Sequence, residues 1–258
     1  MSAGAEGPVR FEERDGIGRV ELDLPPVNVL DRAALGELDA TLSRAAASTE
    51  LDVVCLRGRG KAFCAGVSVE DHLPDRVDGT LELFGDVVER LLTLPVPVVA
   101  AVHGAALGGG CELAAACDVV VARDDATLGQ PEIRLGVFPP AAAALLPRLV
   151  GRQRALDLIL TGRSLRAREA LQAGLVQHVF PRETWEEDVE AYLSRMAGLS
   201  RPVLRMAKRA TVDGLDRPVR EAMRGAERLY LEELMELEDP REGLEAFLDR
   251  REPAWKDG

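Results

Sequence analysis

The sequence feature that most constrains the fold is a run of three glycines between two apolar segments. Pro97 to Val102 is short and rich in valine, which is typical of a buried strand. Gly108 to Gly110 follow, and Glu112 to Cys117 is alanine-rich and predicts a helix. Glycines at a helix start leave backbone N–H groups unobstructed at the positive end of the helix dipole. They also permit tight strand–helix packing, and the two interpretations weigh equally for the triplet alone.

Two glutamates are the main candidate functional residues. Glu112 is the first charge after the glycines, and a carboxylate in an apolar helix is costly unless it is paired or catalytic. Glu132 follows Pro131, so it is expected in the first turn of a helix or in a tight loop. Two neighbouring carboxylates divide the work of general acid and general base. The alternative is that one of them is a structural salt-bridge partner, for example of Arg134 or Arg148.

Short apolar strands alternate with glycine-rich loops and helices, which predicts an α/β architecture. The expected strands are Ile17–Leu24, Val53–Leu56, Pro97–Val102, Asp118–Ala122 and Val176–Phe180. Asp31 is the expected N-cap of a helix that ends near Ala47, Ser68 to Asp71 has the pattern of a capping box, and another helix is expected near Leu81–Leu94. From Arg182 the pattern becomes helical, with one helix from Arg217 to Leu237 and a last one from Pro240 to near Arg251. Residues 1–8 are expected to be loose.

Several segments together resemble the enoyl-CoA hydratase/isomerase (crotonase) superfamily, nearly from end to end. Each segment is weak alone, but their order and spacing are specific. They are Gly60–Val67, Gly104–Asp118, Gly129–Glu132 with Leu135-Gly136, Thr161–Arg163, Ala173–Val176 and Arg241–Phe247. The resemblance implies a ClpP/crotonase-like ββα spiral core over residues 1–198 and a helical C-terminal trimerisation module over residues 199–258. It also implies a homotrimer or a dimer of trimers.

The resemblance further implies where the reaction takes place. Matched residue by residue, the backbone N–H groups of Val67 and Gly109 form an oxyanion hole for the thioester carbonyl. The expected activity is hydration of an α,β-unsaturated acyl-CoA, with Glu112 positioning and activating water and Glu132 supplying the α-proton. The apportioning of these two roles is a hypothesis. The nearest rival is a Δ3,Δ2-enoyl-CoA isomerase, which needs only one carboxylate, and a rival from another class is a non-catalytic RNA-binding or scaffold relative.

The chain departs from the common family pattern at two places. Ser68 stands where many members carry aspartate, and Val137 to Arg148 is rich in proline and alanine where glycines are common. The second departure implies a differently shaped wall around the acyl pocket. It resembles the branch that acts on cyclohexa-1,5-diene-1-carboxyl-CoA, which is the alternative substrate.

The resemblance also suggests contacts with coenzyme A, which is part of the substrate. Its candidate contacts are Lys61, Ala65, Val67, Phe247 and Arg250. Phe247 and Arg250 are expected on one face of the last helix and would reach a neighbouring subunit's nucleotide. A solvated loop charge explains Lys61 equally well, and core packing explains Phe247 nearly as well.

Composition bounds the remaining possibilities. The formal net charge of −12 argues against a nucleic-acid surface. No apolar run is long enough to span a bilayer and no leader is recognisable, so no membrane association is expected. The four cysteines lack metal-type spacing and are expected to be structural thiols in a reducing cytoplasm, and the three histidines are expected to be structural. Because the oxyanion hole and the two carboxylates suffice for the expected reaction, we expect no metal and no separate cofactor.

Overall fold

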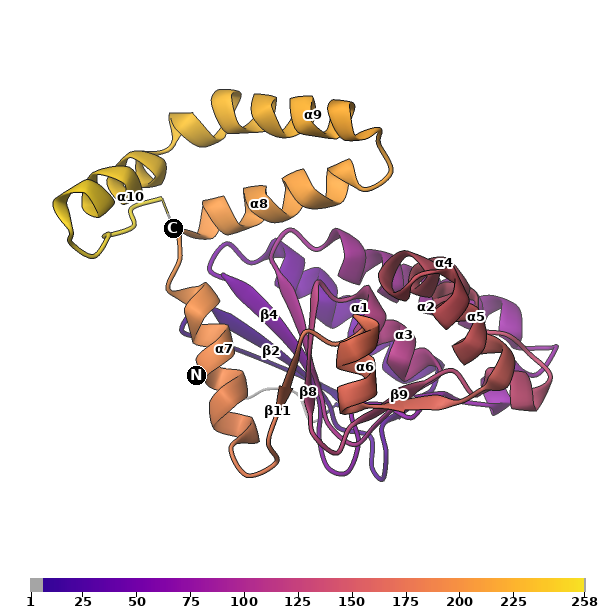
Figure 1. The fold of residues 1–258 in the computed structure, drawn as a ribbon. Helices are drawn as coiled ribbons and strands as arrows, with labels where there is room; N and C mark the ends of the chain where they lie inside the picture. The colour runs from indigo at the N-terminus through magenta and orange to yellow at the C-terminus, as the bar shows by residue number, and fades with distance from the viewer. Residues whose placement is uncertain (1–6, 258) are drawn as a thin grey trace.

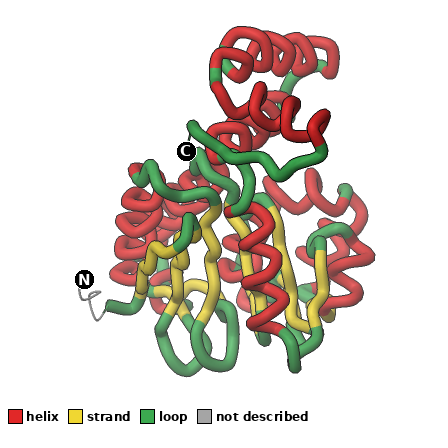
Figure 2. The backbone as a smooth tube through the Cα atoms, turned by 90° about the vertical axis from the view of Figure 1, so that its left-hand side faces the viewer, coloured by secondary structure: helices red, strands yellow, loops and turns green. Residues whose placement is uncertain are grey.

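The computed structural model describes residues 7–257 of the 258-residue chain, so most of the segment expected to be loose lies outside the described residues. Figure 1 shows a core of strands and helices from which the last three helices stand off to one side. In Figure 2, turned by 90°, the strands lie in the centre of the core with helices on either side.

The central sheet has six strands in the order β1–β2–β4–β6–β8–β11. β1 and β2 form an antiparallel pair, and every other neighbouring pair in this sheet is parallel. The bounds are β1 (Val9–Arg14), β2 (Ile17–Leu22), β4 (Val53–Gly58), β6 (Val98–Val102), β8 (Val119–Arg123) and β11 (His178–Phe180). All five residues of β6 are buried, as expected for a central parallel strand covered on both faces.

Five shorter strands form two smaller sheets. β3 (Val29–Leu30) pairs with β5 (Gly66–Val67), and β9 (Thr127–Gly129) lies between β7 (Ala105–Leu107) and β10 (Ser164–Arg166). Along the chain, a strand of the central sheet, a short strand and a helix recur as β2–β3–α1, β4–β5–α2, β6–β7–α3 and β8–β9–α4. This is the predicted ββα spiral, and the α/β prediction is confirmed.

The helices account for most of the remaining chain. Their bounds are α1 (Arg32–Ala47), α2 (Val77–Thr93), α3 (Gly109–Ala116), α4 (Pro140–Val150), α5 (Arg152–Thr161), α6 (Ala167–Ala173), α7 (Trp185–Ala197), α8 (Arg201–Gly214), α9 (Val219–Glu232) and α10 (Glu238–Asp249), with 3-10 turns η1 (Glu70–His72), η2 (Glu132–Leu135) and η3 (Leu234–Glu236). Among the described helices, none combines the length and the apolar character needed to cross a bilayer.

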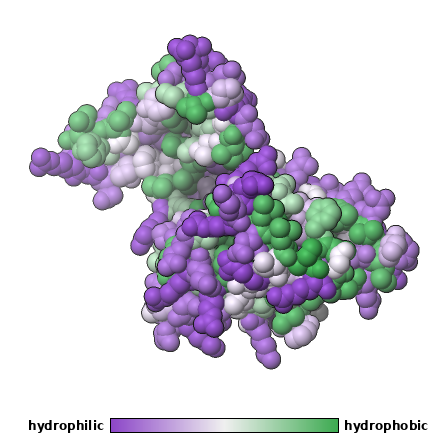
Figure 3. Space-filling view, turned by 45° about the vertical axis from the view of Figure 1, so that its right-hand side comes forward, coloured by the Kyte–Doolittle hydropathy of each residue, from purple (hydrophilic) through white to green (hydrophobic). Residues whose placement is uncertain are grey.

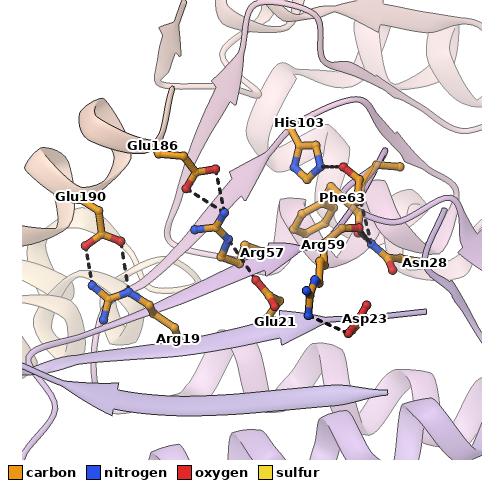
Figure 4. A network of polar contacts seen from close by, with 12 residues as sticks. Arg19, Glu21, Asp23, Asn28, Arg57, Arg59, Phe63, His103, Glu186 and Glu190 are labelled. Atoms are coloured by element: carbon orange, nitrogen blue, oxygen red, sulfur yellow. Dashed lines mark hydrogen bonds and ion pairs between the residues drawn. The ribbon is translucent and has the colours of Figure 1, made fainter. Parts of the chain in front are cut away.

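Helix α7 covers one face of the central sheet. Its Trp185, Val189 and Leu193 are buried against apolar side chains of β2, β4, β6 and β8. Two ion pairs fix its polar side: Arg19 of β2 with Glu190, and Arg57 of β4 with Glu186 at 2.9 Å (Figure 4). The larger apolar cluster, with α1, α2 and α3, fills the other face.

Three sequence-based expectations about helices were wrong. Ser68 to Asp71 is not a capping box, because η1 has no side-chain cap and the following helix begins only at Val77. Leu73 is extended before Pro74, as sterics before proline require, and this interrupts the helix. The helix expected from Arg217 to Leu237 ends at Glu232, with a separate 3-10 turn after it. Arg250 is the left-handed C-cap of α10, so it does not continue the helical face of Phe247.

Asn28 ties the loop before β3 to the loop before β5. Its side chain is 1% exposed, and its amide nitrogen donates to the carbonyls of Arg59, Ala62 and Phe63 at 3.0, 2.8 and 3.1 Å (Figure 4). Its amide oxygen accepts from the N–H of Leu24 at 2.8 Å. The buried side-chain amide of Asn28 therefore fixes the backbone of the segment that leads to Val67.

Replacing Asn28 by aspartate should destabilise the protein by roughly 2–4 kcal/mol, because a carboxylate oxygen would then face three carbonyl oxygens in a buried site. Urea unfolding measures the difference. Asp31→Asn is the control, since asparagine caps α1 as well as aspartate does and stability should hardly change. Equal stability of N28D and wild type would contradict this account of the loop.

Candidate active site

Glu112 lies in α3, all of whose residues are buried, and its side chain points to the start of α4. Glu112 is 4% exposed, and its Oε1 accepts from the backbone N–H of Ala142 at 2.6 Å. Pro140 is the first residue of α4 and has no N–H, so the free N–H groups at this helix end belong to the residues after it. The carboxylate therefore occupies the positive end of a helix.

Opposing effects act on the pKa of Glu112. Burial raises it, the N–H of Ala142 lowers it, and the charge of Glu132 raises it again, so that the pKa lies at about 7. A group with this pKa is present in both protonation states near neutral pH, as acid–base catalysis requires.

Glu132 begins η2, directly after Pro131, as expected from the sequence. A Cβ placed on Gly108 would lie 2.6 Å from its Oε1, so the carboxylate lies over the glycine run that precedes Glu112. Burial raises the pKa of Glu132 too. Neither glutamate has an ion-pair partner among residues 7–257, and Arg148 instead donates to the carbonyl of Ala144. A structural salt bridge therefore does not explain either carboxylate.

Two residues near Glu132 were missed as site residues by sequence reasoning. Gln130 is fully buried, and in the amide orientation that suits its neighbours its nitrogen donates to both carboxylate oxygens, at 3.1 and 3.2 Å. His72, interpreted above as structural, is near enough for its charge to lower the pKa of Glu132, and its Nδ1 donates to the carbonyl of Ser68 at 2.8 Å. In the sequence, the one signal for either residue was that Gln130 lies in the Gly129–Glu132 segment, which carries part of the family resemblance. No sequence pattern indicated a role for His72.

The two loops expected to carry oxyanion donors lie against each other. A Cβ on Gly109 would lie 2.7 Å from Cγ2 of Val67, and one on Gly66 would lie 3.8 Å from the nitrogen of Gly109. Gly109 is the first residue of α3, so its N–H has no acceptor within the helix. The arrangement brings Val67, Gly109, Glu112 and Glu132 to one place in the fold.

The expected coenzyme A contacts fall into two separate groups. Lys61, Ala65 and Val67 belong to the loop beside Gly109; Lys61 is exposed and Ala65 donates from its backbone to the carbonyl of Val27 at 2.9 Å. Phe247 and Arg250 belong to α10 and its C-cap, at the opposite end of the molecule from α3 and α4 in Figure 1. Within one chain the structure therefore does not bring them to the site.

The other titratable candidates have structural surroundings. His103 is 6% exposed, burial lowers its pKa, and its Nε2 donates to the carbonyl of Gly60 (Figure 4). All four cysteines are free and buried, and burial raises the pKa of each thiol. Within the described part of the chain, no group of three or more His, Cys, Asp or Glu residues could hold a metal ion.

Comparison with known proteins identifies the family. Residues 12–258 match the Enoyl-CoA hydratase/isomerase family. The chain is 40% identical over 260 residues to cyclohexa-1,5-dienecarbonyl-CoA hydratase of Thauera aromatica, with 98% of both chains covered, and 38% identical over 248 residues to a probable enoyl-CoA hydratase of Rhizobium meliloti, covering 95% and 96%. The crystal structure of an enoyl-CoA hydratase from Bacillus anthracis superposes with a TM-score of 0.92 at 32% identity, covering 98% and 100%. The chain belongs to the enoyl-CoA hydratase/isomerase family, and the predicted superfamily and general hydratase class are confirmed.

Glu112→Gln should stabilise the protein at pH 8 by up to about 3 kcal/mol, because the folded pKa of about 7 exceeds the ordinary value of 4.5. Between the unfolded pKa of 4.5 and the folded pKa of about 7, the folded wild type binds more protons than the unfolded chain, so its free energy of unfolding falls as pH rises. The advantage of E112Q should therefore shrink toward pH 5. Urea unfolding at both pH values measures it, with Glu89→Gln on the exposed face of α2 as the control. An E112Q variant less stable than wild type at pH 8 would contradict the assignment.

Proposed function

We propose that this protein adds water across the α,β double bond of an acyl-CoA thioester, using Glu112, Glu132 and the N–H groups of Val67 and Gly109. The observation that carries the proposal is that two partly or fully buried carboxylates, both with raised pKa values, lie beside two glycine-rich loops that present backbone donors. The hydratases among the relatives named above support the same reaction.

In the proposed reaction the oxygen of water attacks Cβ as one glutamate takes the water's proton. The electron pair of the double bond moves toward the thioester, whose oxygen gains negative charge between the two N–H groups. Cα then receives a proton from the other glutamate, so the pair ends with the same number of protons as it began. A lost donor at such an oxyanion site typically slows the reaction by roughly 10²–10³-fold.

We keep the hypothesis that Glu112 activates water and Glu132 protonates Cα, with the two titrating as a coupled pair. The carboxylate of Glu112 is already held by the N–H of Ala142, which favours its ionised form and suits a base. All atoms that react belong to water, the thioester and these side chains, so the proposed reaction needs no metal and no separate cofactor.

We also propose a cytoplasmic location, which the four free thiols favour.

The finer proposal is that the acyl group is a cyclic diene. The start of α4, with Pro139 and Pro140 where glycines are common in the family, forms the support of Glu112, so a change there alters the site directly. The relative from Thauera aromatica at 40% identity carries this substrate in its name. Isomerase activity is the second candidate within the family, and the net charge of −12 disfavours an RNA-binding role.

The direct test follows loss of the conjugated thioester absorbance with crotonyl-CoA and with cyclohexa-1,5-diene-1-carboxyl-CoA. Turnover of the cyclic diene alone supports the finer proposal, and fast turnover of crotonyl-CoA supports a general short-chain hydratase. Shifting of the double bond of a 3-enoyl-CoA without hydration would favour the isomerase. No reaction with any of the three would contradict the proposed function.

Glu112→Gln and Glu132→Gln should each lower kcat by at least about 10²-fold, since each removes a group that must gain or lose a proton. Steady-state kinetics on the accepted substrate measure the loss. Glu70→Gln in the exposed part of η1 is the control and should retain wild-type turnover. Circular dichroism confirms that the variants fold; persistent turnover in either site variant would remove that residue from the mechanism.

We further propose that the chain forms a trimer or a dimer of trimers. α8 and α9 have no buried residue in the single chain. Exposed apolar side chains gather on the C-terminal helices and, separately, on the segment from η2 to α5 (Figure 3): Leu215, Val219, Met223, Leu231, Phe247 and Leu248 in the first group, and Leu135, Phe138, Leu149 and Leu160 in the second. Two different apolar faces on one chain favour a head-to-tail contact that closes into a ring.

Light scattering coupled to size exclusion should therefore give three or six times the chain mass of 27.9 kDa. Met223→Glu on α9 places a charge within an apolar face and should shift the protein to smaller species. Glu227→Gln on the same helix is the control and should leave the mass unchanged. A wild type that is monomeric at micromolar concentration would contradict the proposal.

A further inference from the structure

Residues 256 and 257 lie along the first turn of α10. The carboxylate of Asp239, 1% exposed, accepts from the backbone N–H of Lys256 at 2.6 Å and of Asp257 at 3.3 Å. In return, the carboxylate of Asp257 accepts from the N–H of Asp239 at 2.7 Å. Carboxylate–N–H bonds are among the stronger hydrogen bonds, and here they run in both directions.

A second carboxylate holds the middle of the same segment. Oε1 of Glu242 accepts from the N–H of Ala254 at 2.8 Å and forms an ion pair with Arg251 at 2.5 Å. The bond from Arg251, and then that from Ala254, lowers the pKa of Glu242 to about 2. Residues 251–257, which we call the tail, are thus bonded to α10 at two places. Asp239 holds them in the first turn of the helix, and Glu242 holds them in the second.

Trp255 connects this assembly to the rest of the molecule. Its indole nitrogen donates to the carbonyl of Gly198, in the connection between α7 and α8, at 3.0 Å. Its ring lies against Gly243 of α10, where a Cβ would come within 3.2 Å of it. One side chain therefore lies between α10 and the end of α7.

Few other contacts fix the direction of α10. Only Asp239, Glu242 and Ala246 of this helix are buried, and the first two of these are the residues that hold the tail. Phe247 is 83% exposed, and Figure 1 shows α10 standing away from the core. The orientation of Phe247 relative to the core thus depends on the tail.

We propose that the tail is a clasp that positions α10 for binding the nucleotide of coenzyme A in a neighbouring copy of the chain, with Trp255 as the main positioning residue. The inference rests on the proposed function and on the expected reach of Phe247 to that nucleotide. The clasp contributes nothing to the carboxylate chemistry, which belongs to α3 and η2. It should affect the nucleotide end of the substrate and leave the acyl end unchanged.

Trp255→Ala tests this with two thioesters of the same acyl group, one on coenzyme A and one on N-acetylcysteamine, which lacks the nucleotide. KM for the coenzyme A thioester should rise about tenfold, as loss of roughly 1.4 kcal/mol of binding predicts, with kcat within about twofold of wild type. The kcat/KM for the N-acetylcysteamine thioester should not change. Trp255→Phe keeps the ring against Gly243 but loses the bond to Gly198, and should give a smaller rise. Glu252→Gln in the same segment is the control, because that side chain is exposed.

Two further measurements separate the clasp from general stability and from the proposed function. Phe247→Ala should raise KM similarly, and adding Trp255→Ala to it should have little further effect, because both act through one contact. Calorimetric titration with free coenzyme A gives a readout without turnover: W255A should bind about tenfold more weakly than wild type. Equal binding by the two proteins, or equal loss for both thioesters, overturns the clasp even where wild-type hydration is normal. Absence of wild-type hydration overturns the proposed function, and coenzyme A binding then still tests the clasp.

Discussion

The structure of the site depends on the close contact between the start of α3 and the loop before β5. A Cβ on Gly110 would lie 2.1 Å from the carbonyl oxygen of Cys64, and one on Gly109 would overlap the side chain of Val67. Any side chain at these positions would push the helix away from the loop. The N–H of Gly109 would then move away from Val67, and Glu112, three residues further along, would move with it. The glycines therefore serve packing and site geometry through the same contact. The two interpretations of the glycine triplet in the sequence, close packing and unobstructed backbone donors, are thus compatible.

Burial of Glu112 opposes folding, and the start of α4 offsets part of that cost. An unpaired carboxylate in an apolar helix would be protonated at neutral pH. The N–H of Ala142 stabilises the ionised form, so the pKa comes to about 7. Pro140 gives α4 a rigid first residue that has no N–H to satisfy, and the free N–H of Ala142 in the same turn donates to the carboxylate. The proline–alanine segment that departs from the family pattern is thus the immediate support of the more deeply buried glutamate.

How much was predictable follows from the range of the interactions. Five strands of the central sheet, the N-cap at Asp31 and the two glutamates follow from local patterns, and the structure has them where expected. β1 and the five short strands β3, β5, β7, β9 and β10 were not predicted. The bond from Ala142 to Glu112 and the effect of the His72 charge on the pKa of Glu132 join segments that are distant in sequence, and no single-sequence pattern encodes them. The local errors had local causes: Pro74 blocked the expected capping box, and a left-handed residue at Arg250 ended the last helix before the second expected anchor.

The reacting groups and the expected nucleotide anchors lie far apart within one molecule (Figure 1), and this separation has a consequence for the proposed assembly. α3, η2 and the donor loop come from one spiral core, whose packing does not involve α10. In a ring of copies, the core of one chain would supply the chemistry and the α10 of the next would supply affinity. Dissociation of the ring would then weaken binding of coenzyme A thioesters while leaving the glutamates and their pKa values in place. Selection on the tail and on α10 would accordingly act on substrate affinity, whereas selection on Gly110, Glu112 and Glu132 would act on the rate of the reaction.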